Sequence, residues 1–94
     1  MNREEVLGKA HECVCGQREQ DYGTPEDNFD RIAKLWNAYL GDYIVNSVDV
    51  AMMMSLLKIA RVKSSDGAST DSFVDLAGYA ACGGEIASRK RKGE

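Results

Sequence analysis

Residues 48–62 restrict how this chain can fold more than any other feature, because almost every one of them is apolar. A helix that is apolar on all sides has to be covered by other structure on most of those sides. The run is shorter than the roughly 18 to 20 apolar residues that a membrane-spanning helix needs. We therefore expect a central, nearly all-apolar helix that begins at Ser47 or just after it and ends near Lys63.

The polar residues within this stretch are Asp49, Ser55, Lys58 and Arg61. They recur in steps of three or six, which places them along one slowly drifting strip of the helix. Charged groups on a mostly buried helix must be paired or must face a cavity. The charged residues of the strip thus either form an internal salt bridge or bind phosphate, with Lys58 and Arg61 as adjacent cationic donors. The acidic partners for a salt bridge are Asp30, Asp71 and Asp75.

The clearest helix start in the sequence is Thr24-Pro25. Thr24 suits the N-cap, Pro25 suits the first helical position, and Asp27 can reach back to complete a capping box. From Phe29 onward the apolar residues keep a 3.6-residue period until near Gly41. The pattern predicts an amphipathic helix and favours a core position for Phe29.

Two more helices complete the predicted fold. One runs from Arg3 to Cys15 with Asn2 as its N-cap, and the last runs from about Asp71 to Ser88. The polar segments 17–23 and 64–70 are predicted to be loops. No segment alternates as a strand does, so we expect a compact four-helix, all-α domain spanning residues 1–94.

The last predicted helix contains three glycines, each of which costs about 1 kcal/mol relative to alanine. Such a cost usually has a packing reason, because small side chains let another backbone approach closely. The small residues expected to share one face are Ala77, Ala80, Ala81 and Gly84. Their partner would be the central helix or another subunit.

The net charge and the length of the chain restrict which molecules it can bind. The formal net charge of −3, from 12 basic and 15 acidic residues, provides no cationic field for duplex nucleic acid. The basic cluster falls within residues 89–94, which we expect to be a frayed tail. A chain of 94 residues buries only about 60 to 65% of its unfolded surface. We therefore expect a homo-oligomer.

The cysteines and the N-terminal residues favour an intracellular protein. The chain has an odd number of cysteines and no hydrophobic leader, which indicates reduced thiols and neither export nor a membrane span. His11, Cys13 and Cys15 are spaced two apart and point in opposing directions on a helix. No fourth ligand is near, so we expect no zinc there.

Acidic residues one helical turn apart form the other candidate site. Asp27 and Asp30 start the second helix, and Asp71 and Asp75 lie near the start of the last one. Carboxylate pairs on facing helices can hold magnesium, which in turn binds polyphosphate. Asp27 is also explained by its capping position, whereas Asp75 has apolar neighbours and favours a functional or salt-bridge role.

Several spaced motifs together suggest a family. The motifs are Arg18-x3-Tyr22-Gly23-x5-Phe29, Asp49-Val50-Ala51, Lys58-Ile59-Ala60-Arg61 and Asp71-x3-Asp75-Leu76-Ala77-Gly78-Tyr79-Ala80. The chain resembles a family of uncharacterised small proteins of tailed phages and prophages, which implies a place in the cytoplasm of an infected or lysogenic bacterium. It is more distantly similar to nucleotide-modification-associated domains and to MazG-like all-α nucleotide pyrophosphohydrolases.

The distant similarity implies a nucleotide ligand. MazG-like enzymes bind magnesium through acidic pairs spaced three apart, whereas Asp71 and Asp75 are spaced four apart and all four candidate acids are aspartate. This departure favours binding without turnover, which needs no cofactor. Tyr22-Gly23, directly before a helix start, suits an anion or an aromatic base. The predicted ligand-binding residues are Arg18, Tyr22, Gly23, Phe29, Lys58 and Arg61.

Three hypotheses result. The preferred one is a nucleotide-binding module, an oligomeric sponge that sequesters a host nucleotide signal, with Tyr22 or Phe29 on the base and Lys58 and Arg61 on phosphate. The second is a magnesium-dependent, MazG-like pyrophosphohydrolase. The third is a structural or interaction protein whose charged strip is a salt-bridge network. The hydrolase would hold magnesium through Asp27, Asp30, Asp71 and Asp75.

Overall fold

The computed structural model describes residues 1–92, apart from the side chains of residues 17–19 and 90–92. Its helices are α1 (Arg3–Cys15), α2 (Gln17–Tyr22), α3 (Pro25–Leu40), α4 (Ser47–Ser64) and α5 (Thr70–Lys92). Residues 1–92 contain no strand, so the all-α prediction is confirmed. Among these residues, no helix is long and apolar enough to cross a membrane.

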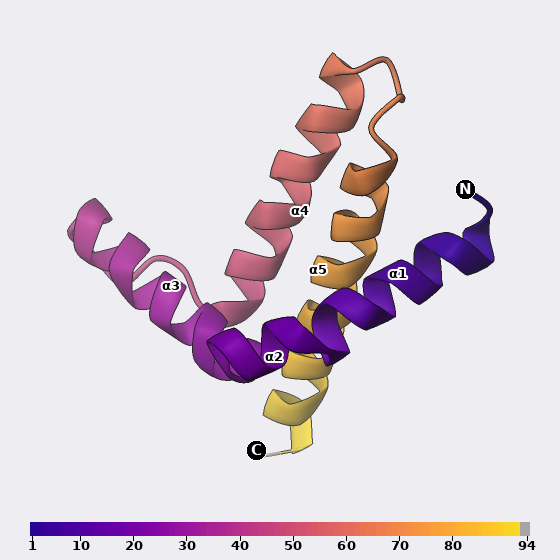
Figure 1. The fold of residues 1–94 in the computed structure, drawn as a ribbon. Helices are drawn as coiled ribbons and strands as arrows, with labels where there is room; N and C mark the ends of the chain where they lie inside the picture. Colours follow the sequence, from indigo (N-terminus) through magenta and orange to yellow (C-terminus); the bar gives the residue numbers. More distant parts are fainter. Residues whose placement is uncertain (93–94) are drawn as a thin grey trace.

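The helices are arranged around the antiparallel pair of α4 and α5, which lie side by side along most of their length (Figure 1). α1 crosses α5 near its middle, and α3 packs against α4 near the base of the pair. The far end of α3 points away from α4. The C-terminal ends of α1 and α5, the short α2 and the N-terminal end of α3 are thereby brought together at one end of the pair.

The segment 17–23 was predicted to be a loop, and this prediction is wrong for most of its length. Residues 17–22 form α2, a helix of 6 residues. Gln, Arg and Glu all have high helix propensity, and the segment lies between two glycines. Gly23 ends it in a left-handed conformation with φ of 81°.

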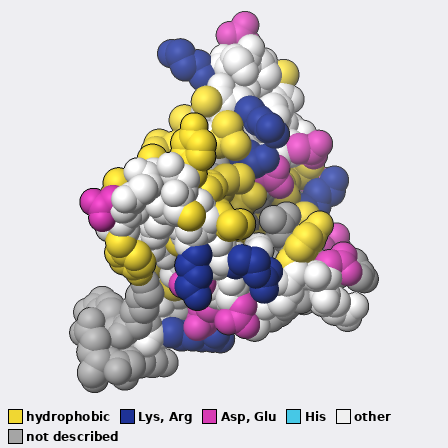
Figure 2. All heavy atoms as spheres, turned by 90° about the vertical axis from the view of Figure 1, so that its left-hand side faces the viewer, with side chains coloured by type: hydrophobic (Ala, Val, Ile, Leu, Met, Phe, Trp, Pro, Cys, Tyr) yellow, Lys and Arg dark blue, Asp and Glu magenta, His cyan; other side chains and the backbone are white. Residues whose placement is uncertain are grey.

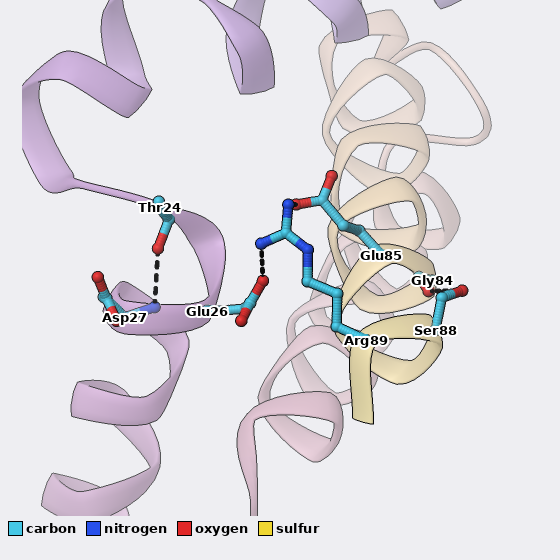
Figure 3. A network of polar contacts seen from close by, with 7 residues as sticks. All are labelled: Thr24, Glu26, Asp27, Gly84, Glu85, Ser88 and Arg89. Atoms are coloured by element: carbon cyan, nitrogen blue, oxygen red, sulfur yellow. Dashed lines mark hydrogen bonds and ion pairs between the residues drawn. The ribbon is translucent and has the colours of Figure 1, made fainter. Parts of the chain in front are cut away.

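Side-chain caps fix the starts of α1, α3 and α4 at the predicted residues. Asn2 accepts from the Glu5 N–H at 2.8 Å, and Thr24 accepts from the Asp27 N–H at 3.2 Å (Figure 3). The complete capping box is at α4, where the Asn46 side chain accepts from the Asp49 N–H at 3.0 Å. The Asp49 carboxylate accepts from the Asn46 N–H at 2.9 Å. Asp49 therefore caps α4 and does not share a site with Lys58.

The connection between α3 and α4 is held by one buried side chain. The Asn37 amide donates to the Val45 carbonyl at 2.8 Å and accepts from the N–H groups of Ile44 and Val45, each at 2.9 Å. The two bonds to Val45 satisfy backbone groups that would otherwise be buried without partners. Asn37 thus fixes the position at which the chain enters α4.

The main core cluster fills the space between α3, α4 and α5. It contains Phe29, Ala33, Val45, Val50, Ala51, Cys82 and Ile86. Gly83 is the close-approach point of α5, because a Cβ atom there would lie 2.9 Å from the Ala51 Cβ. The predicted small face does not pack on α4, since Ala80, Ala81 and Gly84 are exposed.

α4 is covered on one side only, so the expectation that it is buried on most sides is wrong for the isolated chain. Its buried residues are Ser47, Val50, Ala51, Ser55 and Lys58. Leu56 on the other side is 63% exposed. Figure 2, which faces the side of α3 and α4, shows hydrophobic side chains gathered over the middle of the molecule. A chain of this size has too little structure to surround a central helix.

α5 continues beyond the predicted end at Ser88 and reaches Lys92. Arg89, placed in the predicted tail, is part of the helix and pairs with Glu26 of α3 (Figure 3). It also lies 3.1 Å from Glu85 within α5. This contact joins the end of α5 to the start of α3. Residues 93 and 94 of the predicted tail lie outside the described residues.

The two adjacent glycines of α5 should respond in opposite ways to alanine. Gly84→Ala should raise the free energy of unfolding by about 1 kcal/mol, because alanine has the higher helix propensity and its Cβ meets nothing within 4 Å. Gly83→Ala gains the same propensity but overpacks against Ala51, which costs about 1 to 3 kcal/mol. Urea unfolding at one protein concentration measures both, and equal stability of the two variants would contradict the packing role of Gly83.

Candidate functional site

The ion pair between Lys58 of α4 and Asp75 of α5 is the centre of the candidate site. The Lys58 ammonium nitrogen lies 3.0 Å from Asp75 Oδ2. The Lys58 side chain is 11% exposed and that of Asp75 is 41% exposed. The salt-bridge interpretation of Lys58 is therefore confirmed, with Asp75 as the partner among the three candidates.

A pocket of about 120 Å³ opens beside this pair. Its walls come from α1, the α2–α3 junction, α4 and α5, so every helix of the fold contributes. The lining residues are Cys13, Val14, Tyr22, Gly23, Pro25, Asn28, Phe29, Lys58, Val74, Asp75, Gly78, Tyr79 and Cys82. Gly78 lets α1 come close to α5 at the pocket wall, since a Cβ at Gly78 would lie 3.0 Å from Val14 Cγ1.

Three aromatic rings surround the pocket. Phe29 is buried, and its ring centroid lies 6.0 Å from that of Tyr79 at an angle of 36°. Tyr22, the last residue of α2, is 56% exposed and stands at the pocket edge. Of these rings, the more exposed Tyr22 offers a flat apolar surface on which a planar ligand can stack.

The size of the pocket restricts its ligand. Pockets for drug-sized molecules measure roughly 300 to 1,000 Å³. At about 120 Å³ this pocket admits one ring system and little more. A larger ligand would extend past Asp75 into a shallow hollow of about 400 Å³, which is also lined by Lys9, Glu12 and Asp71.

The electrostatics of the pair differ from those of a phosphate site. Lys58 already has a carboxylate at 3.0 Å, so an anion would have to compete with Asp75 for it. Together the two side chains present N–H donors and carboxylate acceptors at one point of the pocket wall. This arrangement suits a neutral polar edge with both donors and acceptors better than it suits an isolated anion.

The structure brings together four of the predicted ligand-binding residues, namely Tyr22, Gly23, Phe29 and Lys58. Arg61 is exposed and does not line the pocket, although it lies one turn beyond Lys58 on α4. The side chain of Arg18 lies outside the described residues. The prediction for Arg18 therefore stays a prediction.

The predicted acidic quartet is dispersed. Asp30 pairs with Lys34 of its own helix at 2.9 Å, and Asp27 sits in the first turn of α3. Asp75 pairs with Lys58, and Asp71 is exposed. Across the described part of the chain, no three His, Cys, Asp or Glu side chains are placed to share a metal ion.

The sequence prediction singled out Asp75 of α5 but missed the rest of the wall that α5 contributes. Asp75, Gly78, Tyr79 and Cys82 all line the pocket. Their spacing of three, four and seven residues places them on one face of a helix. The sequence signal for this wall was the pair Gly78-Tyr79, a small residue next to an aromatic one, on the same helix face as Asp75.

Residues 5–87, which include the whole pocket, match the family model described as Domain of unknown function (DUF6378). The chain, which is all-helical over its described residues, belongs to this family. Its predicted resemblance to a family of phage proteins is confirmed by two relatives.

Both relatives are named Gene 55 protein. The one from Mycobacterium phage D29 is 43% identical over 91 residues, which cover 97% of this chain and 59% of that protein. The one from Mycobacterium phage L5 is 49% identical over 75 residues, which cover 80% of this chain and 47% of that protein. The chain thus spans about half the length of these curated relatives. No solved structure matches it.

Asp75→Asn should destabilise the protein more than Lys58→Met does. Without Asp75 the nearly buried ammonium has no counter-charge, and we expect a loss of about 2 kcal/mol in the free energy of unfolding. Without Lys58 the more exposed Asp75 carboxylate can be hydrated, and methionine keeps the packing, so the loss should stay below about 1 kcal/mol. Urea unfolding followed by circular dichroism measures both.

The exposed pair of Asp30 and Lys34 provides the control. Asp30→Asn should cost less than about 0.5 kcal/mol, because the pair is solvated. A loss for Asp75→Asn as small as that for Asp30→Asn would contradict the assigned burial of Lys58.

Proposed function

We propose that this chain is a small nucleotide-binding protein of phage type, which holds the base of a nucleotide in the pocket beside Lys58 and Asp75 and releases it unchanged. One observation carries the proposal. Lys58, which is almost buried and ion-paired with Asp75, lines a pocket whose walls also include three aromatic residues.

The base fits the pocket in size and in chemistry. Nucleobases are planar rings whose edges combine hydrogen-bond donors and acceptors. The Lys58 ammonium can donate to such an edge while the Asp75 carboxylate accepts from it. Stacking on an aromatic side chain adds about 1 to 3 kcal/mol per base, and Tyr22 stands at the pocket edge.

The phosphate would lie outside the pocket. Lys58 was expected to bind phosphate, but its pairing with Asp75 supports a role on the base edge. Arg61 is exposed one turn further along α4 and can reach a phosphate as the ligand leaves the pocket. Two features of the prediction are thus retained, the stacking tyrosine and the phosphate-binding arginine.

The phage relatives support a role during infection. In this proposal the protein, as a homo-oligomer, sequesters a host nucleotide signal such as a cyclic or adenosine-diphosphate-ribose-type messenger. Sequestration requires tight binding and no turnover. The dispersed aspartates give the alternative, a magnesium-dependent MazG-like hydrolase, less support than the pocket gives binding.

The test is thermal unfolding with linear and cyclic nucleotides, with and without magnesium. A ligand present at 100 times its Kd stabilises the folded state by about 2.7 kcal/mol, which should raise the Tm by about 14 °C. We expect stabilisation without magnesium, and recovery of the intact nucleotide by chromatography after the protein is denatured. Magnesium-dependent conversion would favour the hydrolase, and no stabilisation by any nucleotide would favour a structural or interaction protein.

Variants locate the binding site. Tyr22→Ala and Lys58→Met should each reduce the affinity at least tenfold, because they remove a stacking surface and a donor. Tyr43→Ala is the matched control, since Tyr43 is 80% exposed and does not line the pocket. Equal affinities of Tyr22→Ala and Tyr43→Ala would place the ligand elsewhere.

A further inference from the structure

The exposed side of α4 is apolar without interruption for more than two turns. Between residues 52 and 60, every exposed residue is apolar. We call this set the outer face of α4: Met52, Met53, Leu56, Leu57, Ile59 and Ala60. Its larger side chains are 43 to 63% exposed. A continuous apolar surface of this kind is typical of a protein interface.

The chain exposes more surface than a folded monomer of its size. A monomer of 10.3 kDa is expected to expose about 5,400 Å², whereas this chain exposes 6600 Å². The excess of about 1,200 Å² is comparable to the roughly 800 Å² that each partner buries in a standard interface. The radius of gyration, 14.1 Å, also exceeds the value of about 12 Å for a compact chain of this length.

Charges are placed symmetrically about the centre of the face. Asp49 precedes Leu56 by seven residues and Lys63 follows it by seven, so all three lie on the same side of the helix. When two copies of α4 pack antiparallel about Leu56, Asp49 of each copy meets Lys63 of the other. An identical copy of this helix is therefore complementary to it in both hydrophobicity and charge.

We propose that the outer face of α4 binds the same face of a second copy of this chain, with the two helices antiparallel and the twofold axis near Leu56. Such an interface is isologous, and residues near the axis meet their own counterparts. The pairing covers the apolar side of α4 that the other helices leave exposed. It does not depend on the nucleotide, because Lys58 faces the opposite side of the same helix.

Molar mass in solution tests the pairing. At about 100 µM, where a dimer of micromolar Kd forms, light scattering should give twice the chain mass of 10.3 kDa. Leu56→Glu should give the chain mass with unchanged circular dichroism, because glutamate keeps the helix propensity and charges the face. Leu7→Glu on α1 is the matched control, since Leu7 is also 63% exposed, and it should remain dimeric.

A monomeric wild-type protein, or a Leu56→Glu variant that remains dimeric, would overturn the proposal. If Leu56→Glu does not fold, disulfide trapping decides. Leu56→Cys with Cys13→Ser and Cys15→Ser should form a disulfide between copies on mild oxidation, and Leu7→Cys in the same background should not. Failure of the Leu56→Cys variant to form this disulfide would overturn the proposed axis. Nucleotide binding by a wild-type monomer would refute the dimer and the homo-oligomeric part of the proposed function, and would leave the proposed nucleotide binding itself standing.

The antiparallel register has its own test. Lys63→Glu should raise the dimer Kd about tenfold, because two attractive contacts with Asp49 become repulsive in a symmetric dimer. Lys9→Glu makes the same change of charge on α1 and should leave the Kd unchanged. Equal Kd values for the two variants in sedimentation equilibrium would overturn the register.

Discussion

The contact between α4 and α5 is the constraint on which the other helices depend. It is close because Gly83 lies against Ala51, and the Lys58–Asp75 pair joins the same two helices further along. α1 packs on α5 and α3 packs on α4, so each takes its position from one member of this pair. The pocket forms where they meet.

The features that the sequence predicts correctly are local. Asn2 and Thr24 cap the helices at the predicted residues, because a cap depends on atoms three residues away. The role of Asn37 was invisible, since its partners at residues 44 and 45 lie beyond a turn and nothing in the sequence joins them. α2 was missed because its six residues have helix propensity but no apolar period.

The candidate site was predicted in part, for a similar reason. The strip on α4 correctly indicated that Lys58 needs a partner or a cavity, and the structure provides both. Sequence spacing could not choose Asp75 over Asp71, because that choice depends on how far α4 slides along α5. Asp49 is part of the helix cap, and Arg61 is exposed on the surface. Both lie at the ends of the strip, and because the strip drifts around the helix, its two ends no longer face the buried side.

Lys58 and Leu56 are two residues apart and therefore point about 200° away from each other on α4. The proposed pocket and the proposed interface thus share one helix but use opposite sides of it, roughly a helix diameter of 10 to 12 Å apart. In the proposed twofold dimer each pocket then lies on the side of α4 that faces away from the partner, so neither ligand would touch the other subunit. Binding would saturate at one nucleotide per chain, without the cooperativity that a site shared across the axis would give.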